Sequence, residues 1–441
     1  MKIFRILFVA FFVVFALDAC KEQERFGISS DDKTIPGAPV IRQVVPMYGG
    51  ARIFYDVPTD EQLLQVVAEV QAKNGKTFRF SSSYFKDSLD VWGLGDTIPY
   101  TFNVYAETRA GTKSTFVPVT VKPLTSSIWH VKNSIVVRPG FGALCIDWKN
   151  ELMQTVNIFI DLDFNLNGLR KEIGVVYSSN KDSVRQFVYD LPNEPINVKV
   201  RVEDIYGNAT DKIEQNGLLL LQDMKIPKRN GETPIWKLPG TNDSIAWVPM
   251  CFGDGANGRL ERVIDDIIDQ RDGMSNYMHA GGKGRTGNSQ DGNVWNLIVD
   301  LGGYWRLSRL ISHQRWDMTD SDPRRNLYRG ENVGHFSLWI LDEDQTDGRE
   351  WEIYGEKITG TWVKLSEHYI PIPENLAGPE YPPIGMRGDE SYMYLDEPKY
   401  TKPVRWFRYE AHSGFLVSNG IPYGNTDHNC LSEITLYGLP Q

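Results

Sequence analysis

Aromatic rings and planar hydrogen-bonding groups gather in two stretches near the C-terminal end of the chain. The first stretch starts at His313 and extends beyond Arg324, and the second ends at His428. An exposed aromatic face can stack on the apolar C–H face of a sugar ring, and Arg, Asn and His side chains can bond its hydroxyl rim. These stretches therefore predict a glycan-binding surface. Its candidate residues are His313, Arg315, Trp316, Arg324, Tyr328, Tyr423, Asn425 and His428.

Some of these residues also have a plainer explanation. Tryptophan is usually well buried, so packing inside the loop or the core is an open alternative for Trp316. A hydrogen-bonded structural role is open for His313, and the sequence slightly favours it. Tyr423 precedes Gly424 and Asn425, a pair that favours an exposed turn and hence an accessible ring.

The familiar motifs for catalysis do not occur in the sequence, which contains neither His-Glu-x-x-His nor Gly-x-Ser-x-Gly. A pair of acidic residues acting as a glycosidase stays open, because acidic residues are common and their separation is unknown. We therefore expect a protein that is not an enzyme.

One acidic stretch, Asp161 to Gly168, resembles the start of an EF-hand calcium loop. Counted from Asp163, however, the twelfth position is Gly174, where calcium binding needs a bidentate glutamate. The stretch therefore predicts a hairpin turn.

The bulk composition fits a globular protein of several domains. The chain has 441 residues, of which 41% are hydrophobic and 24% charged. Its formal net charge of −10 argues against a nucleic-acid partner. No Cys-x-x-Cys spacing occurs, so a structural zinc site is not expected. Cys251 and Cys430 could form a disulfide or remain two thiols, and the sequence leaves both options open.

The N-terminal end has the pattern of an export signal. Lys2 and Arg5 precede an apolar run from Ile6 to Leu17, which is shorter than the roughly 20 residues that a membrane span needs. A small residue directly before Cys20 resembles a bacterial lipobox, which implies cleavage there and lipid on Cys20. An ordinary signal with a chance cysteine is the alternative, since Asp18 departs from the lipobox pattern. The predicted segments are a signal peptide at 1–19 and a flexible tether at 20–35.

Two consecutive stretches share a layout of short strands with alternating apolar and polar residues. Tyr100 to Glu107 in the first stretch matches Ile196 to Glu203 in the second, about 96 residues later. Such strands, separated by Gly, Pro and Asn turns, are typical of β-sandwiches. Leu94 and Tyr100 resemble the tyrosine corner of fibronectin type III domains, whereas Ile196 replaces the tyrosine in a second, immunoglobulin-like stretch. The predicted domains are 36–123 and 124–226.

The third stretch, residues 228–441, has long loops and most of the tryptophans and histidines. Its strand motifs include Asn296 to Gly302, Phe336 to Ile340, Arg405 to Tyr409 and Ser432 to Gly438. Their order and spacing resemble a discoidin, or coagulation-factor type C, domain, the jelly roll of carbohydrate-binding module family 32. The resemblance implies that loops at one end of the jelly roll bind ligand.

Members of the discoidin family often carry a structural calcium ion near the start of the jelly roll. Calcium takes six to eight hard oxygen ligands, which one acidic loop of this chain can offer. Glu433 matches the acidic residue that closes the site in relatives. A solvated acidic turn is the alternative. The candidate metal ligands are Asp265, Asp266, Asp269, Ser275 and Glu433.

The sequence thus predicts an all-β chain, with two immunoglobulin-like or fibronectin type III-like β-sandwiches followed by a discoidin-like, galactose-binding-like β-jelly roll. This order of parts resembles surface glycan-binding lipoproteins of Bacteroidetes polysaccharide-utilisation loci. The resemblance implies capture of polysaccharide or oligosaccharide at the outer membrane, facing the exterior, beside an importer complex. The alternatives are an adhesion or scaffold protein that binds a protein partner, and a glycoside hydrolase with an unrecognised site.

Overall fold

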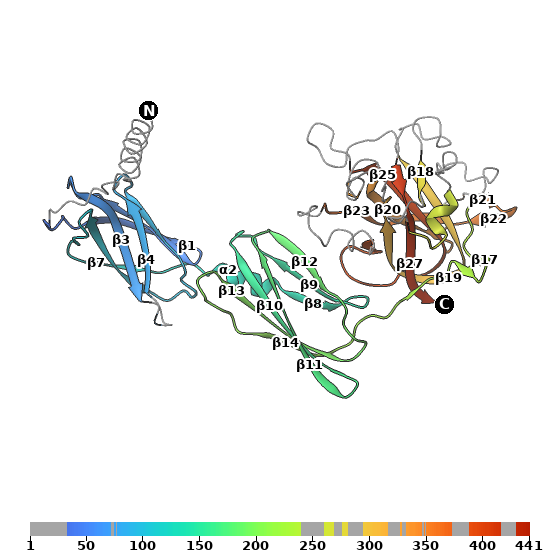
Figure 1. The fold of residues 1–441 in the computed structure, drawn as a ribbon, viewed down its shortest axis with the longest axis horizontal. Helices are drawn as coiled ribbons and strands as arrows, with labels where there is room; N and C mark the ends of the chain where they lie inside the picture. Colours follow the sequence, from blue (N-terminus) through green and yellow to red (C-terminus); the bar gives the residue numbers. More distant parts are fainter. Residues whose placement is uncertain are drawn as a thin grey trace, which may run out of the picture. The chain divides into compact units, whose positions relative to one another are not determined.

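The computed structural model shows an all-β chain, as the sequence predicts (Figure 1). It describes residues 33–71, 75, 77–239, 260–268, 276–280, 294–315, 327–328, 332–345, 348, 350–372, 388–415 and 429–441. Within these ranges there is one α-helix, α2 (Ser127–Ser134), and one 3-10 helix, η1 (Leu260–Ile264). Neither of these two helices is long and apolar enough to cross a membrane.

The first sandwich consists of a three-stranded and a four-stranded antiparallel sheet. The smaller sheet has the order β1 (Val40–Met47), β2 (Gly50–Asp56), β5 (Ser88–Val91). The larger sheet has the order β4 (Thr77–Ser83), β3 (Leu63–Gln71), β6 (Tyr100–Thr108), β7 (Val117–Val121). Alternation along the strands directs one side of each sheet into a shared core, which includes Ile53, Val66 and Phe102.

The second sandwich repeats this topology. Its smaller sheet has the order β12 (Ser183–Val188), β9 (Leu144–Lys149), β8 (Val136–Pro139). Its larger sheet has the order β11 (Leu169–Ser179), β10 (Val156–Leu166), β13 (Ile196–Asp204), β14 (Ile213–Leu218). Ile146, Ile158 and Val200 are fully buried in it. The shared strand order confirms the predicted internal repeat.

A hydroxyl group makes the same buried hydrogen bond in both sandwiches. Ser114 Oγ accepts from the N–H of Ala106 at 2.9 Å, and Thr210 Oγ1 accepts from the N–H of Val202 at 3.1 Å. The backbone of each pair is also bonded in the reverse direction, because the N–H of the hydroxyl residue donates to the other carbonyl. The repeat therefore extends to single hydrogen bonds.

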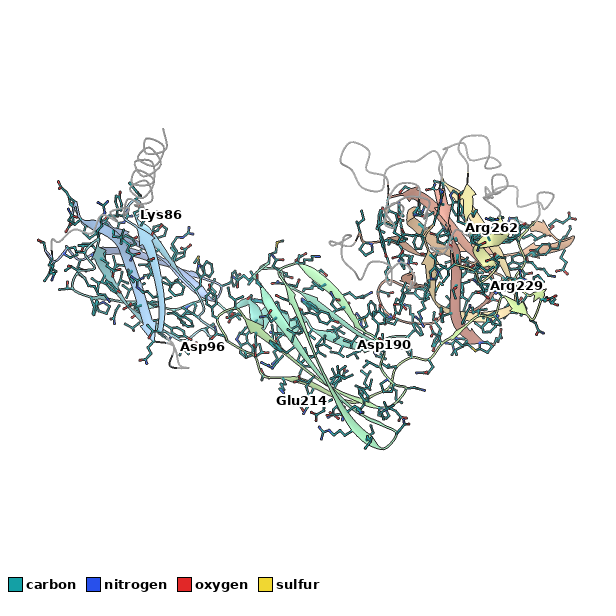
Figure 2. All side chains as sticks on the ribbon, in the orientation of Figure 1. Lys86, Asp96, Asp190, Glu214, Arg229 and Arg262 are labelled. Carbon is teal, nitrogen blue, oxygen red and sulfur yellow. The ribbon has the colours of Figure 1, made fainter. Side chains whose placement is uncertain are left out.

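Tyr100 at the start of β6 forms the expected tyrosine corner. Its hydroxyl donates to Asp96 Oδ1 at 2.8 Å, and Asp96 is labelled in Figure 2. Leu94, two residues before Asp96, is buried. Burial raises the pKa of Tyr100, and Asp96 adds to the effect, so the phenol stays protonated and remains a donor. Ile196, at the matching place of the second sandwich, is fully buried, so apolar packing replaces the hydrogen bond there.

The stretch that resembles an EF-hand loop is a tight hairpin, as predicted. Strands β10 and β11 are paired from Val156 opposite Ser179 up to the turn. Asn167 and Gly168 form this turn, with φ angles of 52° and 79°. Positive φ at both central positions is the mark of a type I′ turn, which Asn-Gly favours because glycine has no Cβ to clash.

The third region is built on one seven-stranded antiparallel sheet (Figure 1). Its order is β15 (Met224–Lys225), β27 (Glu433–Pro440), β19 (Trp295–His313), β25 (Pro403–Gly414), β20 (Val333–Asp342), β23 (Thr361–Tyr369), with β24 (Asp389–Tyr392) beside β19. Three short pairs accompany it: β16 (Arg229–Asn230) with β17 (Thr233–Pro234), β18 (Met278–Ala280) with β26 (Asn429–Leu431), and β21 (Glu350–Ile353) with β22 (Glu356–Thr359). Membership of the discoidin family stays a prediction.

The two faces of this large sheet are covered differently. One face packs on the main core of the region, which contains Phe336, Leu338 and Phe407. At one end of the opposite face, Trp351 of hairpin β21–β22 belongs to a second apolar cluster with Trp406 of β25. Further along the strands, this opposite face carries polar and aromatic side chains from β20, β23 and β25.

The chain divides into two compact units, and the second unit includes two segments of the second sandwich. Residues 138–144 and 187–193 belong to the same unit as residues 220–441. Within that unit the Phe187 ring is stacked on the Tyr392 ring, with centres 5.1 Å apart and an interplanar angle of 10°. An aromatic pair of this geometry contributes stability beyond the area that the two rings bury.

Replacing Ser114 with alanine is expected to lower the unfolding free energy of the first sandwich by about 1–2 kcal/mol, because the buried N–H of Ala106 loses its acceptor. Thr210→Val is expected to have the same effect on the second sandwich. Denaturant unfolding of the soluble chain measures both. The exposed Ser83 supplies the matched control, and Ser83→Ala should change the free energy by less than about 0.5 kcal/mol. An equal loss for all three variants would contradict the role of the buried hydroxyls.

Candidate functional site

Five of the eight predicted glycan-binding residues lie outside the described part of the chain, so their role stays a prediction. They are Trp316, Arg324, Tyr423, Asn425 and His428. The other three are described: His313 ends β19, Arg315 follows it, and Tyr328 lies in the short described segment 327–328.

His313 and Tyr328 are buried, with exposed fractions of 5% and 4%. The Tyr328 N–H donates to Gln314 Oε1 at 2.6 Å, and its hydroxyl donates to Asp389 Oδ1 at 2.9 Å. A φ of 54° places Tyr328 in the left-handed region, which a non-glycine residue rarely adopts. Both side chains are thus almost fully enclosed, and direct contact of either one with a sugar stays a prediction. Their position fits a supporting role.

Arg315 is half-buried, and its groups contact other residues of the third region. Its Cζ lies 4.2 Å from the centre of the Tyr277 ring, and its Nη1 lies 3.9 Å from Cys430 Sγ. Its N–H donates to Asn332 Oδ1 at 2.7 Å, and Asn332 Nδ2 donates back to the Arg315 carbonyl at 3.1 Å. These contacts fix the chain just after β19. Contact of Arg315 with a sugar stays a prediction. Cys251 lies outside the described residues, so a disulfide with Cys430 and a pair of thiols both stay open.

A carboxyl group with an altered pKa lies beside the buried tyrosine. Asp389 starts β24 and accepts hydrogen bonds from Gln314 Nε2 at 2.7 Å and from the Tyr328 hydroxyl. Burial raises the pKa of Asp389 to about 6, and the two hydrogen bonds offset this only in part. Each oxygen of the Asp389 carboxyl group already has a donor. The group therefore holds the side chains of Gln314 and Tyr328 in place.

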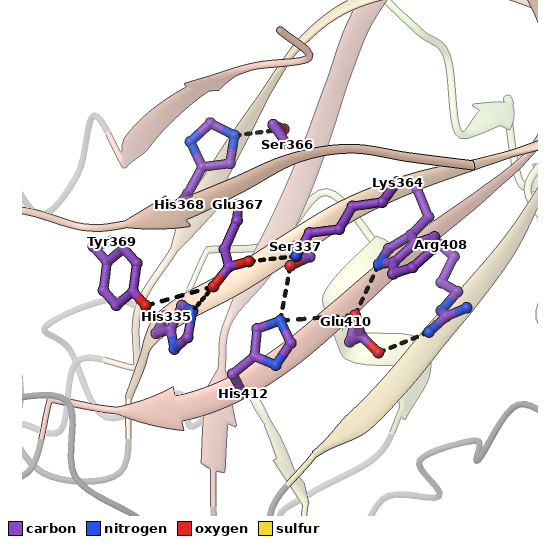
Figure 3. Close-up of polar contacts among 11 residues, drawn as sticks. His335, Ser337, Lys364, Ser366, Glu367, His368, Tyr369, Arg408, Glu410 and His412 are labelled. Atoms are coloured by element: carbon purple, nitrogen blue, oxygen red, sulfur yellow. Dashed lines mark hydrogen bonds and ion pairs between the residues drawn. The ribbon is translucent and has the colours of Figure 1, made fainter. Parts of the chain in front are cut away.

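A set of side chains that the sequence analysis did not single out forms an exposed site on the large sheet (Figure 3). The rings of Tyr369, His335 and His412 follow one another across β23, β20 and β25. The ring centres of Tyr369 and His335 are 4.0 Å apart at 13°, and those of His335 and His412 are 4.5 Å apart at 31°. Glu367 and Lys364 lie beside these rings. We call these five residues the ring platform.

Polar contacts hold the two imidazoles of the ring platform in place. His335 Nε2 lies 2.7 Å from Glu367 Oε1, and Lys364 pairs with the other oxygen of the same carboxylate. His412 Nε2 lies 2.8 Å from Ser337 Oγ. Each imidazole thus has one ring nitrogen engaged, so its orientation is set before any ligand binds. Such preorganisation lowers the entropy cost of binding.

A more deeply placed row of residues adjoins the platform on the same face. Glu410 accepts from Trp339 Nε1 at 2.8 Å and from the Arg408 guanidinium at 2.7 Å. The Arg408 Cζ also lies 4.4 Å from the centre of the Trp339 ring. Burial lowers the pKa of Arg408, and the Glu410 carboxylate opposes that effect. His412 Nε2 lies 3.7 Å from Glu410, so this row anchors the inner end of the ring stack.

The outer part of the ring platform is open to solvent along the edge strand β23. Tyr369 is 55% exposed, and the side chains of Glu367 and Lys364 are 37% and 39% exposed. Lys364 and then His335 hold the pKa of Glu367 at about 2, so its carboxylate stays ionised and accepts hydrogen bonds. A carboxyl group with a lowered pKa is a poor proton donor. The arrangement therefore suits binding of hydroxyl groups better than general acid catalysis.

The sequence carries a signal for this platform in its long strands. His335 and Ser337 alternate with core residues along β20, and Glu410 and His412 do so along β25. Polar and aromatic residues at every second position indicate a sheet face that is not part of the main core. The signal does not say which strands are neighbours, so it cannot assemble the platform.

The described members of the predicted calcium site lie around a lysine. Asp266 and Glu433 both pair with Lys228, and Asp265 Oδ1 accepts from Asn276 Nδ2 at 3.1 Å. The other two predicted ligands lie outside the described residues: Asp269 and Ser275. Among the described residues, no group of three or more His, Cys, Asp or Glu side chains is placed to hold a metal ion. A bound calcium ion stays a prediction.

The sandwiches, the large sheet and the ring platform define a multidomain all-β chain with one partly exposed face of ordered polar and aromatic side chains. Two family models match the chain: a domain of unknown function (DUF4959) at residues 36–123, and a domain of unknown function (DUF5126) at residues 124–218. No curated protein matches it.

Two of the solved structures that match the chain are the following. A SusE-like protein is 20% identical, with a TM-score of 0.34, and the match covers 71% of this chain and 100% of that one. A segment of two fibronectin type III domains from chicken tenascin is 13% identical, with a TM-score of 0.19, and the match covers 41% of this chain and 98% of that one. Similarity this distant carries no conclusion about function.

The raised pKa of Asp389 predicts a pH dependence of stability. Between about pH 4 and pH 6 the folded chain keeps a proton that the unfolded chain releases, so the unfolding free energy falls as pH rises through this window and levels off above it. Asp389→Asn should remove this contribution, which is about 3 kcal/mol, and should be more stable than the parent chain above pH 6. Calorimetric melting at a series of pH values measures the change. The exposed Glu352→Gln is the control, and an unaltered pH profile in Asp389→Asn would refute the assignment.

Proposed function

We propose that this chain is a lipid-anchored, cell-surface glycan-binding protein that captures polysaccharide for uptake or degradation and catalyses no reaction itself. The observation that carries the proposal is the ring platform, where the exposed Tyr369 ring lies beside the ionised Glu367 and Lys364. The function of the whole chain is inferred from this site and from the order of its parts.

The chemistry of the ring platform matches that of a sugar ring. Tyr369 is 55% exposed and His335 is stacked on its ring, so the exposed part of the tyrosine can receive the apolar C–H face of a pyranose. Glu367 is ionised at any pH above about 4. His335 and Lys364 each contact one of its oxygens, and the remaining lone pairs of this partly exposed carboxylate can accept from sugar hydroxyls, while the Lys364 ammonium can donate. An exposed ring beside charged groups on a sheet face can bind a polysaccharide chain along its side.

The remaining parts of the chain would position this site at the cell surface. Lipid on Cys20 would anchor the chain at the outer membrane, and the two sandwiches would act as a spacer between the anchor and the third region. A single shallow sugar site binds weakly, so many anchored copies on one surface would supply avidity. An importer complex or a degrading enzyme beside it would take over the captured glycan.

One observation favours the alternative of a protein partner. Phe85 is 81% exposed, and its ring centre lies 3.9 Å from that of Tyr84 at the turn between β4 and β5. Exposed aromatic residues are frequent in protein interfaces. This surface lies on the first sandwich, so a partner bound there is compatible with glycan binding by the third region.

Removal of the outer ring of the platform should weaken glycan binding. For the soluble chain that starts after Cys20, Tyr369→Ala should reduce retardation in affinity gels and weaken binding of the retained polysaccharide about three- to tenfold, since one stacking contact contributes about 0.5–1.5 kcal/mol. Glu367→Gln should weaken binding through loss of a charged acceptor. A panel of neutral and acidic polysaccharides identifies the retained glycan.

Tyr304 supplies the matched control, because it is 46% exposed in the same region but does not belong to the platform. Tyr304→Ala should bind as the parent chain does. If Trp316→Ala abolishes retardation while Tyr369→Ala leaves it unchanged, the binding site is in the loops and not on the sheet. If the gels retain the chain with no polysaccharide of the panel, the result would favour the alternative that it binds a protein partner. Release of reducing sugar by the parent chain would overturn the proposal that it is not an enzyme.

The lipid anchor has its own test. Cys20→Ser should move the full-length protein from the membrane fraction to the soluble exported fraction, because acyl chains on the cysteine supply the membrane affinity. Labelling with a fatty-acid analogue should mark the parent protein and not the variant. Protease added to intact cells should degrade the parent protein if it faces the exterior. An unlabelled parent protein would contradict the anchor.

A further inference from the structure

Lys228 is a fully buried ammonium group at the start of the third region. The residue is 1% exposed, and its side chain is completely enclosed. Its carbonyl accepts from the N–H of Ile235 at 2.8 Å and from the N–H of Trp236 at 3.2 Å, which fixes its backbone. Its Nζ lies 5.3 Å from the centre of the Trp236 ring. A buried lysine is costly unless its charge is paired, so its partners define its role.

Two carboxylates from distant parts of the region surround the Lys228 ammonium. It pairs with Glu433 Oε1 at the start of β27 and with Asp266 Oδ1 at 3.0 Å in the acidic loop after η1. The N–H of Asp266 also donates to Glu433 Oε2 at 3.0 Å. Lys225 Nζ pairs with Asp266 from a more exposed position, at 2.8 Å. The four residues form a series of ion pairs, Lys225–Asp266–Lys228–Glu433, in which opposite charges alternate.

Glu433 is the residue of this series that most needs a cation. It is 1% exposed, and burial raises its pKa, an effect that the adjacent Lys228 opposes. A buried carboxylate with no opposite charge would be strongly destabilising. In a discoidin-like domain, calcium would be expected to meet this need, and Glu433 and Asp266 are two of its predicted ligands.

The residues around Glu433 do not fit a calcium ion. Calcium takes six to eight oxygen ligands at 2.3–2.6 Å. Here Lys228 already pairs with one oxygen of Glu433 and with Asp266, so a divalent ion between them would meet a positive charge at close range. Asp265 Oδ1 is also engaged, because it accepts from the N–H of Ile267 at 2.9 Å and from Asn276 Nδ2.

We infer that the Lys228 ammonium is the structural cation of the third region, in the place where the family resemblance puts calcium. It joins three segments that are far apart in sequence: the chain after β15, the acidic loop after η1, and the start of β27. A cation that belongs to the chain cannot dissociate. The third region therefore keeps this link at any calcium concentration. The inference does not depend on the proposed glycan-binding function.

Melting of the unaltered chain gives the first test. The melting temperature of the third region should stay within about 1 °C whether calcium chloride or EDTA is added, because a ligand stabilises a fold only when it binds the native state. Titration calorimetry with calcium alone should show no binding at micromolar to millimolar concentrations. A rise in melting temperature with calcium, or a bound calcium ion in the soluble chain, would overturn the inference.

A pair of substitutions tests the lysine itself. Lys228→Met keeps most of the side-chain volume but removes the charge, and should lower the melting temperature by about 10 °C because Glu433 is left unpaired. The double variant Lys228→Met with Glu433→Gln removes both charges and should regain more than half of that loss. Lys225→Met is the matched control, since Lys225 is 47% exposed, and it should shift the melting temperature by less than about 3 °C.

Equal melting of Lys228→Met and the unaltered chain would refute a structural role for the charge. A double variant that melts no higher than Lys228→Met would show that packing, and not the ionic pair, is what Lys228 contributes. If the single variant fails to fold, the comparison of the unaltered chain with and without calcium still decides between a lysine and a metal ion.

Discussion

Each long strand of the seven-stranded sheet supplies side chains to both faces of the sheet, in alternation. The rest of the third region depends on this constraint. Successive side chains point to opposite faces, so the residues that fill the core decide which residues face the other way. In β20, Phe336 and Leu338 pack in the main core, and this places His335 and Ser337 on the opposite face. A slip of one residue would bury the histidine and expose the core. The register that packs the core therefore also positions the ring platform.

The opposite face changes character along its strands. Near one end, hairpin β21–β22 adds Trp351 to an apolar cluster that also contains Trp406. Trp339 lies at the boundary, because it packs against this cluster while its indole N–H donates to Glu410. Past this boundary the face is polar. The rings and charged groups of the ring platform lie there and do not pack in the apolar core. A preorganised surface of this kind is what binding requires.

Two lysine–glutamate pairs in the third region show how burial decides the role of a charge. Lys364 and Glu367 lie at the surface, where the pair costs little and keeps the carboxylate ionised. Lys228 and Glu433 are enclosed, where an unpaired charge would be strongly destabilising and the pair holds the chain together. The first pair is available to solvent and ligand, whereas the second is available to neither.

Features that depend on residues close together in the chain could be read from the sequence. Alternation predicted the strands and the all-β class, the stretch Asp161 to Gly168 predicted a hairpin, and Leu94 with Tyr100 predicted a tyrosine corner. The sequence could not show that Tyr328 is buried, nor that Lys228 pairs with Glu433, 205 residues away. It also could not bring the rings of β20, β23 and β25 together. Contacts of this kind depend on which strands are adjacent and on which face is covered, and only the packing of the whole region decides both.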